Sequence, residues 1–242
     1  MSRFLIEALL HVLILIPFAV FLAKEKTKEN YLRIFLFALV YVLYQLVLVL
    51  PRLVPALNLI DSRWNWDGKI FGILFGVACY FALRRYFRAD DFLTLRQDRV
   101  NFKKTLAVAV AAVALVTLVA YLMAGSSEFS AETLAFQLTM PALDEELLFR
   151  VVLLGLLASA LRDKIAFLGD PAVLLTAVLF GLLHALTLDK NYALGFEPVY
   201  FLHTAFGGLV FGWLTIKSRS FLLALLVHGL ANFLAALATM LK

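Results

Sequence analysis

The stretch Glu145–Arg150, with the sequence EELLFR, places two adjacent carboxylates and one guanidinium inside an apolar segment of a chain that is 63% hydrophobic. Ionised groups within a membrane helix are costly, so they mark candidate functional sites. Two further pairs with a spacing of four follow in later apolar segments: Phe180 with His184, and His228 with Asn232. Together the three motifs predict a catalytic constellation within a membrane.

The composition excludes an ordinary soluble domain. The mean hydropathy is +0.92, and 16% of the residues are charged. The 242 residues suffice for about eight spans of ~20 residues each, so we expect a polytopic, all-α membrane bundle. The net charge of +5 does not indicate nucleic-acid binding, because the basic residues gather in loops between apolar segments. A single cysteine, Cys79, excludes an internal disulfide and any multi-cysteine metal site.

Apolar windows predict eight transmembrane helices in a single membrane domain that spans residues 1–242. No linker is long enough to separate two domains, and no internal repeat is visible. Residues 1–132 are expected to form N-terminal helices, and residues 133–242 carry the motifs. The windows cover residues 4–23, 31–50, 69–87, 105–124, 133–161, 171–188, 199–216 and 220–241.

The basic residues are divided unevenly between alternate loops. Fifteen of the 22 lysines and arginines, Arg88 among them, lie in or beside the first, third, fifth and seventh loops, whereas six lie on the opposite side. Because cytoplasmic loops retain lysine and arginine, both termini are expected outside the cytoplasm. Trp64 and Trp66 precede the third window and are expected to anchor it at the membrane interface, with substrate contact as the alternative.

The adjacent carboxylates are expected to do different things. A helix over residues 133–161 rises about 1.5 Å per residue, which brings Glu145 roughly 18 Å in from its outer end, near the middle of the bilayer. Glu146 and Arg150 are four residues apart and can form an ion pair on one face. Glu145 is rotated by about 100° and is free to act as a general base on a water molecule. The alternative is that the charges only hold helices together, but Asp144 makes three consecutive acids, more than one arginine neutralises.

The two histidine motifs each present polar groups on one helix face, because residues four apart stack. A histidine can accept a proton or donate to an oxyanion, and an asparagine amide donates without titrating. Each histidine alone is more often a packing residue, whereas the three motifs together favour hydrolysis of a peptide bond by an activated water. His203 could also face the site, while His11 is expected to make a local polar contact with Glu7.

The pattern EExxxR, FxxxH and HxxxN, on consecutive apolar segments and in this order, resembles the CPBP family. This family, also called the Abi family, comprises type II CAAX prenyl endopeptidases and bacteriocin-processing intramembrane proteases. The resemblance extends from about residue 133 to the C-terminus. It implies a helical bundle whose catalytic residues line an intramembrane cavity. Short loops make the chain similar to prokaryotic members, which implies a multi-pass protein of the plasma membrane.

The resemblance also implies roles for the motif residues. Glu145 would activate the hydrolytic water, with His184 as its partner, while His228 and Asn232 would stabilise the oxyanion. The residues that would maintain the site are Glu146, Arg150 and Phe180. No metal or other cofactor is implied, and a zinc ion held by the glutamate and the histidines is the alternative that the sequence leaves open.

The expected function is that of an intramembrane, glutamate-dependent endopeptidase that cleaves a membrane-associated protein or peptide. Its expected partners are that substrate and the lipid bilayer, with no nucleic acid. The alternatives are a noncatalytic scaffold or immunity protein of the same family, and a zinc-dependent membrane protease. A proton-coupled transporter is disfavoured, because the two halves of the chain show no inverted repeat.

Overall fold

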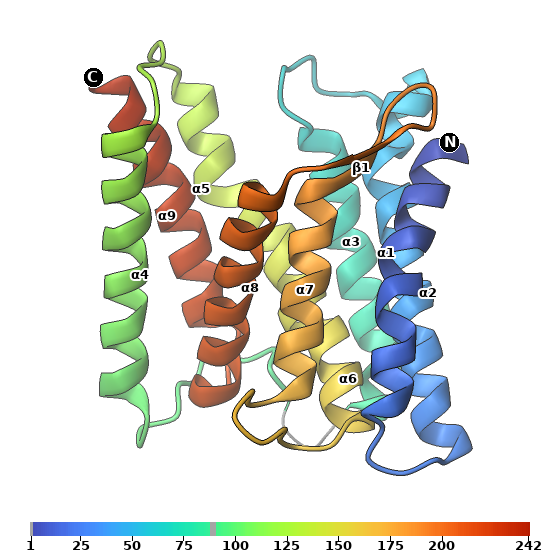
Figure 1. Ribbon diagram of the computed structural model, residues 1–242. Helices are drawn as coiled ribbons and strands as arrows, with labels where there is room; N and C mark the ends of the chain where they lie inside the picture. The colour runs from blue at the N-terminus through green and yellow to red at the C-terminus, as the bar shows by residue number, and fades with distance from the viewer. Residues whose placement is uncertain (1, 88–90) are drawn as a thin grey trace.

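Each apolar window of the sequence contains a helical segment in the computed structural model, which describes residues 2–87 and 91–242 (Figure 1). Arg88, counted above among the basic loop residues, lies outside the described residues. The helices and strands are α1 (Ser2–Phe21), α2 (Lys28–Leu53), the 3-10 helix η1 (Pro55–Leu57), α3 (Trp66–Leu83), the 3-10 helix η2 (Arg84–Tyr86), α4 (Phe102–Met123), α5 (Ala131–Glu146), the π-helix η3 (Leu147–Leu153), α6 (Leu154–Ala160), α7 (Pro171–Ala185), β1 (Leu186–Leu188), β2 (Leu194–Phe196), α8 (Pro198–Ser218) and α9 (Leu222–Met240).

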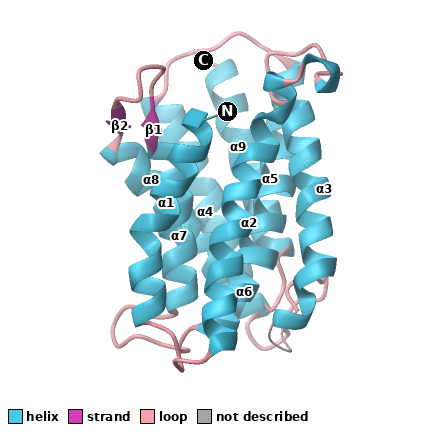
Figure 2. Cartoon of the chain, turned by 90° about the vertical axis from the view of Figure 1, so that its right-hand side faces the viewer, coloured by secondary structure: helices cyan, strands magenta, loops and turns pink. Residues whose placement is uncertain are grey.

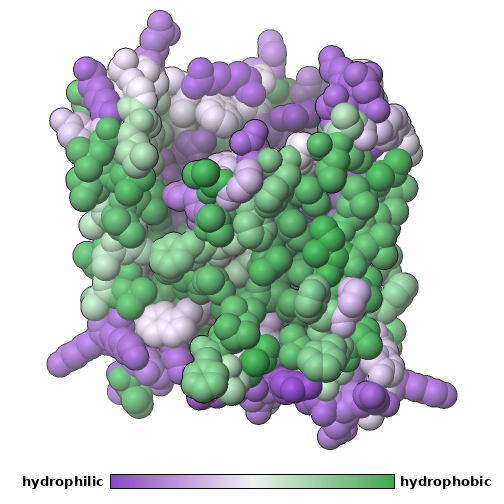
Figure 3. Space-filling model, viewed as in Figure 1, coloured by the Kyte–Doolittle hydropathy of each residue, from purple (hydrophilic) through white to green (hydrophobic). Residues whose placement is uncertain are grey.

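The chain is an integral, multi-pass membrane protein with an all-α bundle, as predicted. Within the described ranges, six helical segments are long and apolar enough to cross a membrane: α1, α2, α3 with η2, α4, α8 and α9. Figure 3 shows the resulting apolar belt between two hydrophilic ends. The expected count of eight spanning helices is not confirmed, because α7 has 15 residues and the window at residues 133–161 is divided into three helical segments.

The helical segment that carries the two glutamates changes its winding directly after them. The 16-residue α5 ends at Glu146 and passes without a break into η3 and then α6. Pro141 lies inside α5 and lacks an N–H, so the turn ahead of the carboxylates loses one backbone hydrogen bond. A π-helical stretch is rare and often marks a functional site. Every residue of η3 and α6 is buried, so this segment forms the centre of the bundle.

Successive spanning segments run in opposite directions, so both termini lie at the same end of the bundle (Figure 1). The loops after α1, α3, α6 and α8, which carry most of the basic loop residues, lie at the other end (Figures 1 and 2). The helices α1, α2 and α3 pack side by side on one flank, and α4 and α9 pack on the other. This arrangement agrees with the alternation expected from the loops, and which end faces the cytoplasm stays a prediction.

A two-stranded hairpin of β1 and β2 lies at the end of the bundle that carries the termini (Figure 2). In place of the expected local contact between them, Glu7 and His11 both reach this hairpin from α1. A Glu7 carboxylate oxygen accepts from the Leu188 N–H at 2.8 Å, and His11 Nε2 lies 2.7 Å from the Leu186 carbonyl oxygen. The other ring nitrogen of His11 bonds the Tyr41 hydroxyl at 2.7 Å. These side chains therefore tie β1 to the first two helices.

Candidate active site

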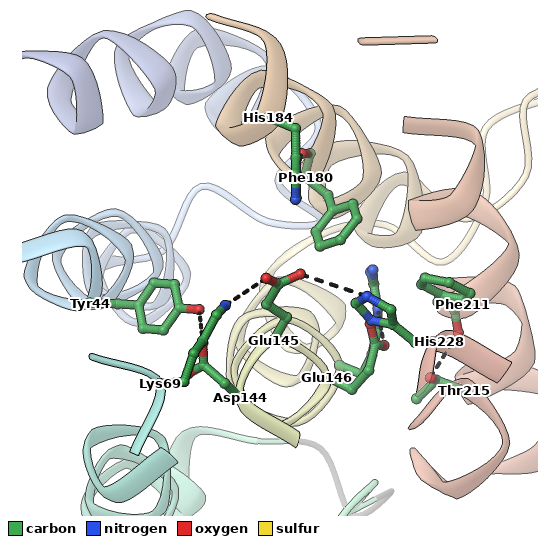
Figure 4. A network of polar contacts seen from close by, with 11 residues as sticks. Tyr44, Lys69, Asp144, Glu145, Glu146, Phe180, His184, Phe211, Thr215 and His228 are labelled. Atoms are coloured by element: carbon green, nitrogen blue, oxygen red, sulfur yellow. Dashed lines mark hydrogen bonds and ion pairs between the residues drawn. The ribbon is translucent and has the colours of Figure 1, made fainter. Parts of the chain in front are cut away.

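Glu145, in the last turn of α5, is held from one side by Lys69 of α3. Lys69 Nζ donates to Glu145 Oε1 at 2.7 Å and to Asp144 Oδ2 at 2.8 Å (Figure 4). The Tyr44 hydroxyl donates to the same Asp144 oxygen at 2.6 Å. The second Glu145 oxygen, Oε2, is buried without a hydrogen-bond partner among the described residues. One oxygen of Glu145 is thus fixed, and the other is available to a water or a substrate.

Glu146 points the other way and uses both of its oxygens. Its Oε2 accepts from Arg150 Nε at 2.9 Å, and its Oε1 accepts from His228 Nδ1 at 2.9 Å. The Glu146 and Arg150 side chains are fully buried. The division into one paired and one available carboxylate, expected from the rotation between neighbouring helical residues, is therefore the arrangement that the structure has. Glu146 also orients the His228 ring, which the sequence did not indicate.

Arg150 has one polar neighbour and three aromatic ones. Its Nη1 and Nη2 have no hydrogen-bond partner among the described residues. Instead, the guanidinium lies 5.5 to 5.8 Å from the ring centres of Phe149, Phe180 and Phe211, within cation–π range. Glu146 is therefore the carboxylate that balances this buried charge, and Phe180 supports it from the FxxxH motif.

The two histidines present the same nitrogen to the site. His184 lies in the last turn of α7, and its Nδ1 donates to the Phe180 carbonyl oxygen at 2.7 Å. His228 Nδ1 donates to Glu146, and its Nε2 lies 4.0 Å from Glu145 Oε2. Because a carbonyl and a carboxylate only accept, Nδ1 carries the hydrogen in both rings. Each neutral ring therefore offers Nε2 as an acceptor, and it donates from Nε2 only when doubly protonated.

The four residues expected to be catalytic line one cavity of about 730 Å³ between α4, α5, α7, α8 and α9. They are Glu145, His184, His228 and Asn232. His203 and Tyr200, from the first turns of α8, line the same cavity, so His203 faces the site as the sequence suggested. Figure 3 shows hydrophilic atoms recessed between apolar walls in the half of the bundle that carries the termini.

The two tryptophans before α3 pack on α5. Trp64 stacks on Phe136 with ring centres 4.8 Å apart, and Trp66 meets the same ring edge-on at 5.2 Å. Trp64 Nε1 also donates to the Thr133 hydroxyl at 3.2 Å. Trp64 lines the cavity, which favours the alternative of a place beside the substrate over a purely interfacial anchor.

The family comparison covers the helices that build this cavity. Residues 127–234 match the family model described as type II CAAX prenyl endopeptidase Rce1-like, a stretch that holds all three motifs. This part of the chain is similar to that family. The resemblance expected from the motifs is therefore confirmed, and the family supports a peptidase that works within a lipid bilayer on peptide substrates. No curated protein and no solved structure among those compared matches the chain.

The arrangement of donors at this site differs from that of a protein zinc site. In the described ranges, no group of three or more histidine, cysteine, aspartate or glutamate side chains is arranged to hold a metal. Zinc sites need such a set converging on one point. Glu145 Oε1 is bonded to the Lys69 ammonium, whose positive charge would oppose a cation at the same carboxylate.

Lys69 and Tyr44 lie outside the Rce1-like match, and sequence reasoning missed their part in the site. Lys69 is one of the six basic residues expected on the side of the membrane that carries the termini, and its position in the sequence does not predict a contact with Glu145. The signal that could have found it is the surplus of acids, because Asp144 and Glu145 need a second cation. A further signal is the glycine spacing of α3: a side chain at Gly72 would lie 2.2 Å from Asp144 Oδ1, so only glycine allows α3 this close.

Proposed function

We propose that the chain is a glutamate-dependent intramembrane endopeptidase of the CPBP type, which cleaves a membrane-associated protein or peptide in a prokaryotic plasma membrane. The observation that carries this proposal is the division of labour at Glu145. One of its oxygens is anchored by Lys69, while Oε2 is buried, unpaired among the described residues and open to the cavity. A general base needs this combination of fixed position and free acceptor.

In the proposed reaction, a water molecule lies between Glu145 Oε2 and His184 Nε2, both of which can accept a hydrogen bond. Glu145 takes a proton from the water as its oxygen attacks the carbonyl carbon of the scissile bond. The tetrahedral intermediate then collapses, and the same proton passes from Glu145 to the leaving amine. Lys69 stays bonded to Oε1 throughout and keeps the carboxylate aimed at the reacting water.

The oxyanion that forms in this step needs hydrogen-bond donors in a site with little water. Asn232 supplies its side-chain N–H groups, which donate at any pH. His228 donates from Nε2 only as an imidazolium, because Nδ1–H is committed to Glu146. We therefore assign Asn232 as the principal donor, with His228 as a second donor whose ring is oriented by its hydrogen bond to Glu146.

The test is a comparison of membrane proteomes from cells that make the wild-type chain or the Glu145→Gln variant. A peptide terminus that depends on Glu145 should be present with the wild type and absent with the variant. Purified wild-type protein in lipid nanodiscs should then cut a synthetic peptide spanning that terminus. Glu132→Gln is the matched control, because it makes the same isosteric change on the exposed first turn of α5.

The proposal fails if purified Glu145→Gln protein retains full proteolysis, because no other carboxylate is assigned as the base. It also fails if no terminus distinguishes the two proteomes, which would favour a noncatalytic member of the family. If Glu145→Gln and Glu132→Gln lower proteolysis equally, the loss of activity would be assigned to the folding of α5 instead.

A further inference from the structure

The hydrogen bonds of the β1–β2 hairpin show which backbone groups face the partner strand and which face outward. The strands pair antiparallel, with Leu186 opposite Phe196 and Leu188 opposite Leu194. The Asp189 N–H donates to the Ala193 carbonyl, and the Glu197 N–H donates to the Ala185 carbonyl, both at 3.0 Å. These two pairs are hydrogen-bonded pairs, and such pairs alternate along an antiparallel ladder.

In this alternation Thr187 and Gly195 form the next hydrogen-bonded pair, and the residues on either side of them point their backbone groups away from the partner strand. These outward residues are Leu186 and Leu188 on β1, and Leu194 and Phe196 on β2. The N–H and C=O groups of Leu194 and Phe196 consequently lie on the outer edge of β2.

The two edges of the hairpin are treated differently. On the β1 edge, Glu7 accepts from the Leu188 N–H and His11 bonds the Leu186 carbonyl oxygen, so α1 closes that edge. On the β2 edge, no hydrogen bond to the outward groups of Leu194 and Phe196 is seen among the described residues. Leu194 is 62% exposed and Phe196 is 47% exposed. An open edge of this kind is a template for pairing with another extended chain.

The open edge leads into the candidate active site. β2 ends at Phe196, and α8 begins at Pro198, so the turn between them is short. The next residues toward the cavity are Tyr200 and His203, which both line it. Figure 1 shows the second hairpin strand running across this end of the bundle directly into α8. The ring of Phe196 lies 5.6 Å from that of Phe201, which fixes the strand to the helix.

We propose that β2 is a docking strand for the substrate, which adds to its open edge as a third, extended strand beside the cavity. This proposal rests on the proposed peptidase function and names the conformation in which the substrate is held. A peptide bond inside a helix is shielded by its own hydrogen bonds, whereas an extended segment exposes its carbonyl carbon to a water. The edge offers an N–H and a C=O at both Leu194 and Phe196, so recognition uses the backbone and tolerates different side chains.

The test uses binding, measured on the Glu145→Gln protein in nanodiscs so that no cleavage interferes. The probe is a fluorescein-labelled decapeptide of alternating valine and threonine, together with a copy that is N-methylated at every second residue. Leu194→Pro removes one outward N–H from the edge, while the inward bonds of β2 to β1 remain possible. Leu194→Ala is the matched control, because it shortens the side chain and keeps the N–H.

Leu194→Pro should weaken binding of the unmodified peptide by roughly 2- to 10-fold or more, the usual effect of one lost hydrogen bond plus a blocked edge, and Leu194→Ala should weaken it less. The N-methylated peptide should bind the protein with Leu194 unchanged more weakly than the unmodified peptide does. Its affinity should fall little further when Leu194→Pro is added. If Leu194→Pro does not fold, the methylated peptide still decides the question. Equal binding of both peptides, or equal affinities for the two variants, would overturn the docking strand. Edge-dependent binding without any Glu145-dependent cleavage would instead overturn the peptidase function and leave the docking strand standing.

Discussion

Glu146→Gln is expected to destabilise the protein strongly, although the change removes no atom from the core. Two donors point at this side chain: Arg150 Nε–H and His228 Nδ1–H, both at 2.9 Å from its oxygens. A glutamine offers one oxygen and one NH₂ group, so one of the two hydrogen bonds is lost unless His228 moves its hydrogen from Nδ1 to Nε2 and accepts from the NH₂ group. Because Arg150 is fully buried, its charge would lose the carboxylate that balances it.

The magnitude follows from the burial. Removing one partner of a buried ion pair costs about 3–5 kcal/mol, because the other charge stays behind uncompensated. At about 2–4 °C per kcal/mol for a chain of this length, the melting temperature should fall by about 6–20 °C. The rings of Phe149, Phe180 and Phe211 remain around the guanidinium and keep the loss from growing further.

Glu145→Gln is the matched comparison, since it makes the same change one residue earlier. In this variant Lys69 keeps its ion pair with Asp144 at 2.8 Å and borders the cavity, so its charge is not left without a partner. The free energy of unfolding should therefore fall by only about 1 kcal/mol. The double variant Glu146→Gln with Arg150→Met should recover at least half of the Glu146→Gln loss, because it removes the stranded charge.

The assay is thermal unfolding of the purified proteins in one detergent, followed by the fluorescence of a thiol-independent dye. The expected difference between Glu146→Gln and Glu145→Gln is about 2–4 kcal/mol, or about 4–16 °C in melting temperature. Melting temperatures within about 2 °C of each other would therefore refute the reasoning. Failure of the double variant to recover stability would equally show that Arg150 is not the group that Glu146 protects.

Further expectations concern the chemistry and the orientation of the chain. Asn232→Ala should lower kcat by roughly 100- to 1,000-fold with little change in KM. A raised KM at unchanged kcat would reassign Asn232 to substrate binding. Lys69→Met should lower kcat about 100-fold, because Glu145 loses the contact that positions it, and Lys69→Arg should restore part of it; equal activity of the two variants would deny the charge a role. Activity should survive strong chelators, and a loss that zinc reverses but magnesium does not would establish a metal site. On a Cys79→Ala background, an impermeant thiol reagent should label Lys190→Cys in intact cells and Lys164→Cys only after the cytoplasm is opened, with the reverse pattern inverting the topology.

The main features of the fold and the local pairing at the glutamates could be predicted from the sequence, because both depend on short-range periodicity. An apolar window locates a helix, and a spacing of four brings Glu146 onto Arg150. The hairpin was missed, because the window that ends at residue 188 stays apolar through β1 although the helix stops at Ala185. Hydropathy does not distinguish a buried strand from the last turn of a helix.

The contacts between distant segments could not be predicted in the same way. Lys69 and Glu145 are 76 residues apart, and His228 and Glu146 are 82 residues apart. Nothing in the spacing of the motifs says which histidine nitrogen faces which carboxylate. The charge surplus at Asp144 did call for another cation, but several basic residues near helix ends could have supplied it. The roles of the motif residues in catalysis stay predictions.

The tie from Lys69 to Asp144 and Glu145 limits how modular this protein can be. The recognised family stretch, residues 127–234, contains both acids but not the lysine that neutralises them. A chimera that transplanted only these helices onto a foreign N-terminal half would inherit two adjacent carboxylates without their cation. Such a graft would need a lysine, on a helix able to approach as closely as α3 does at Gly72, before the transplanted helices could pack around both acids.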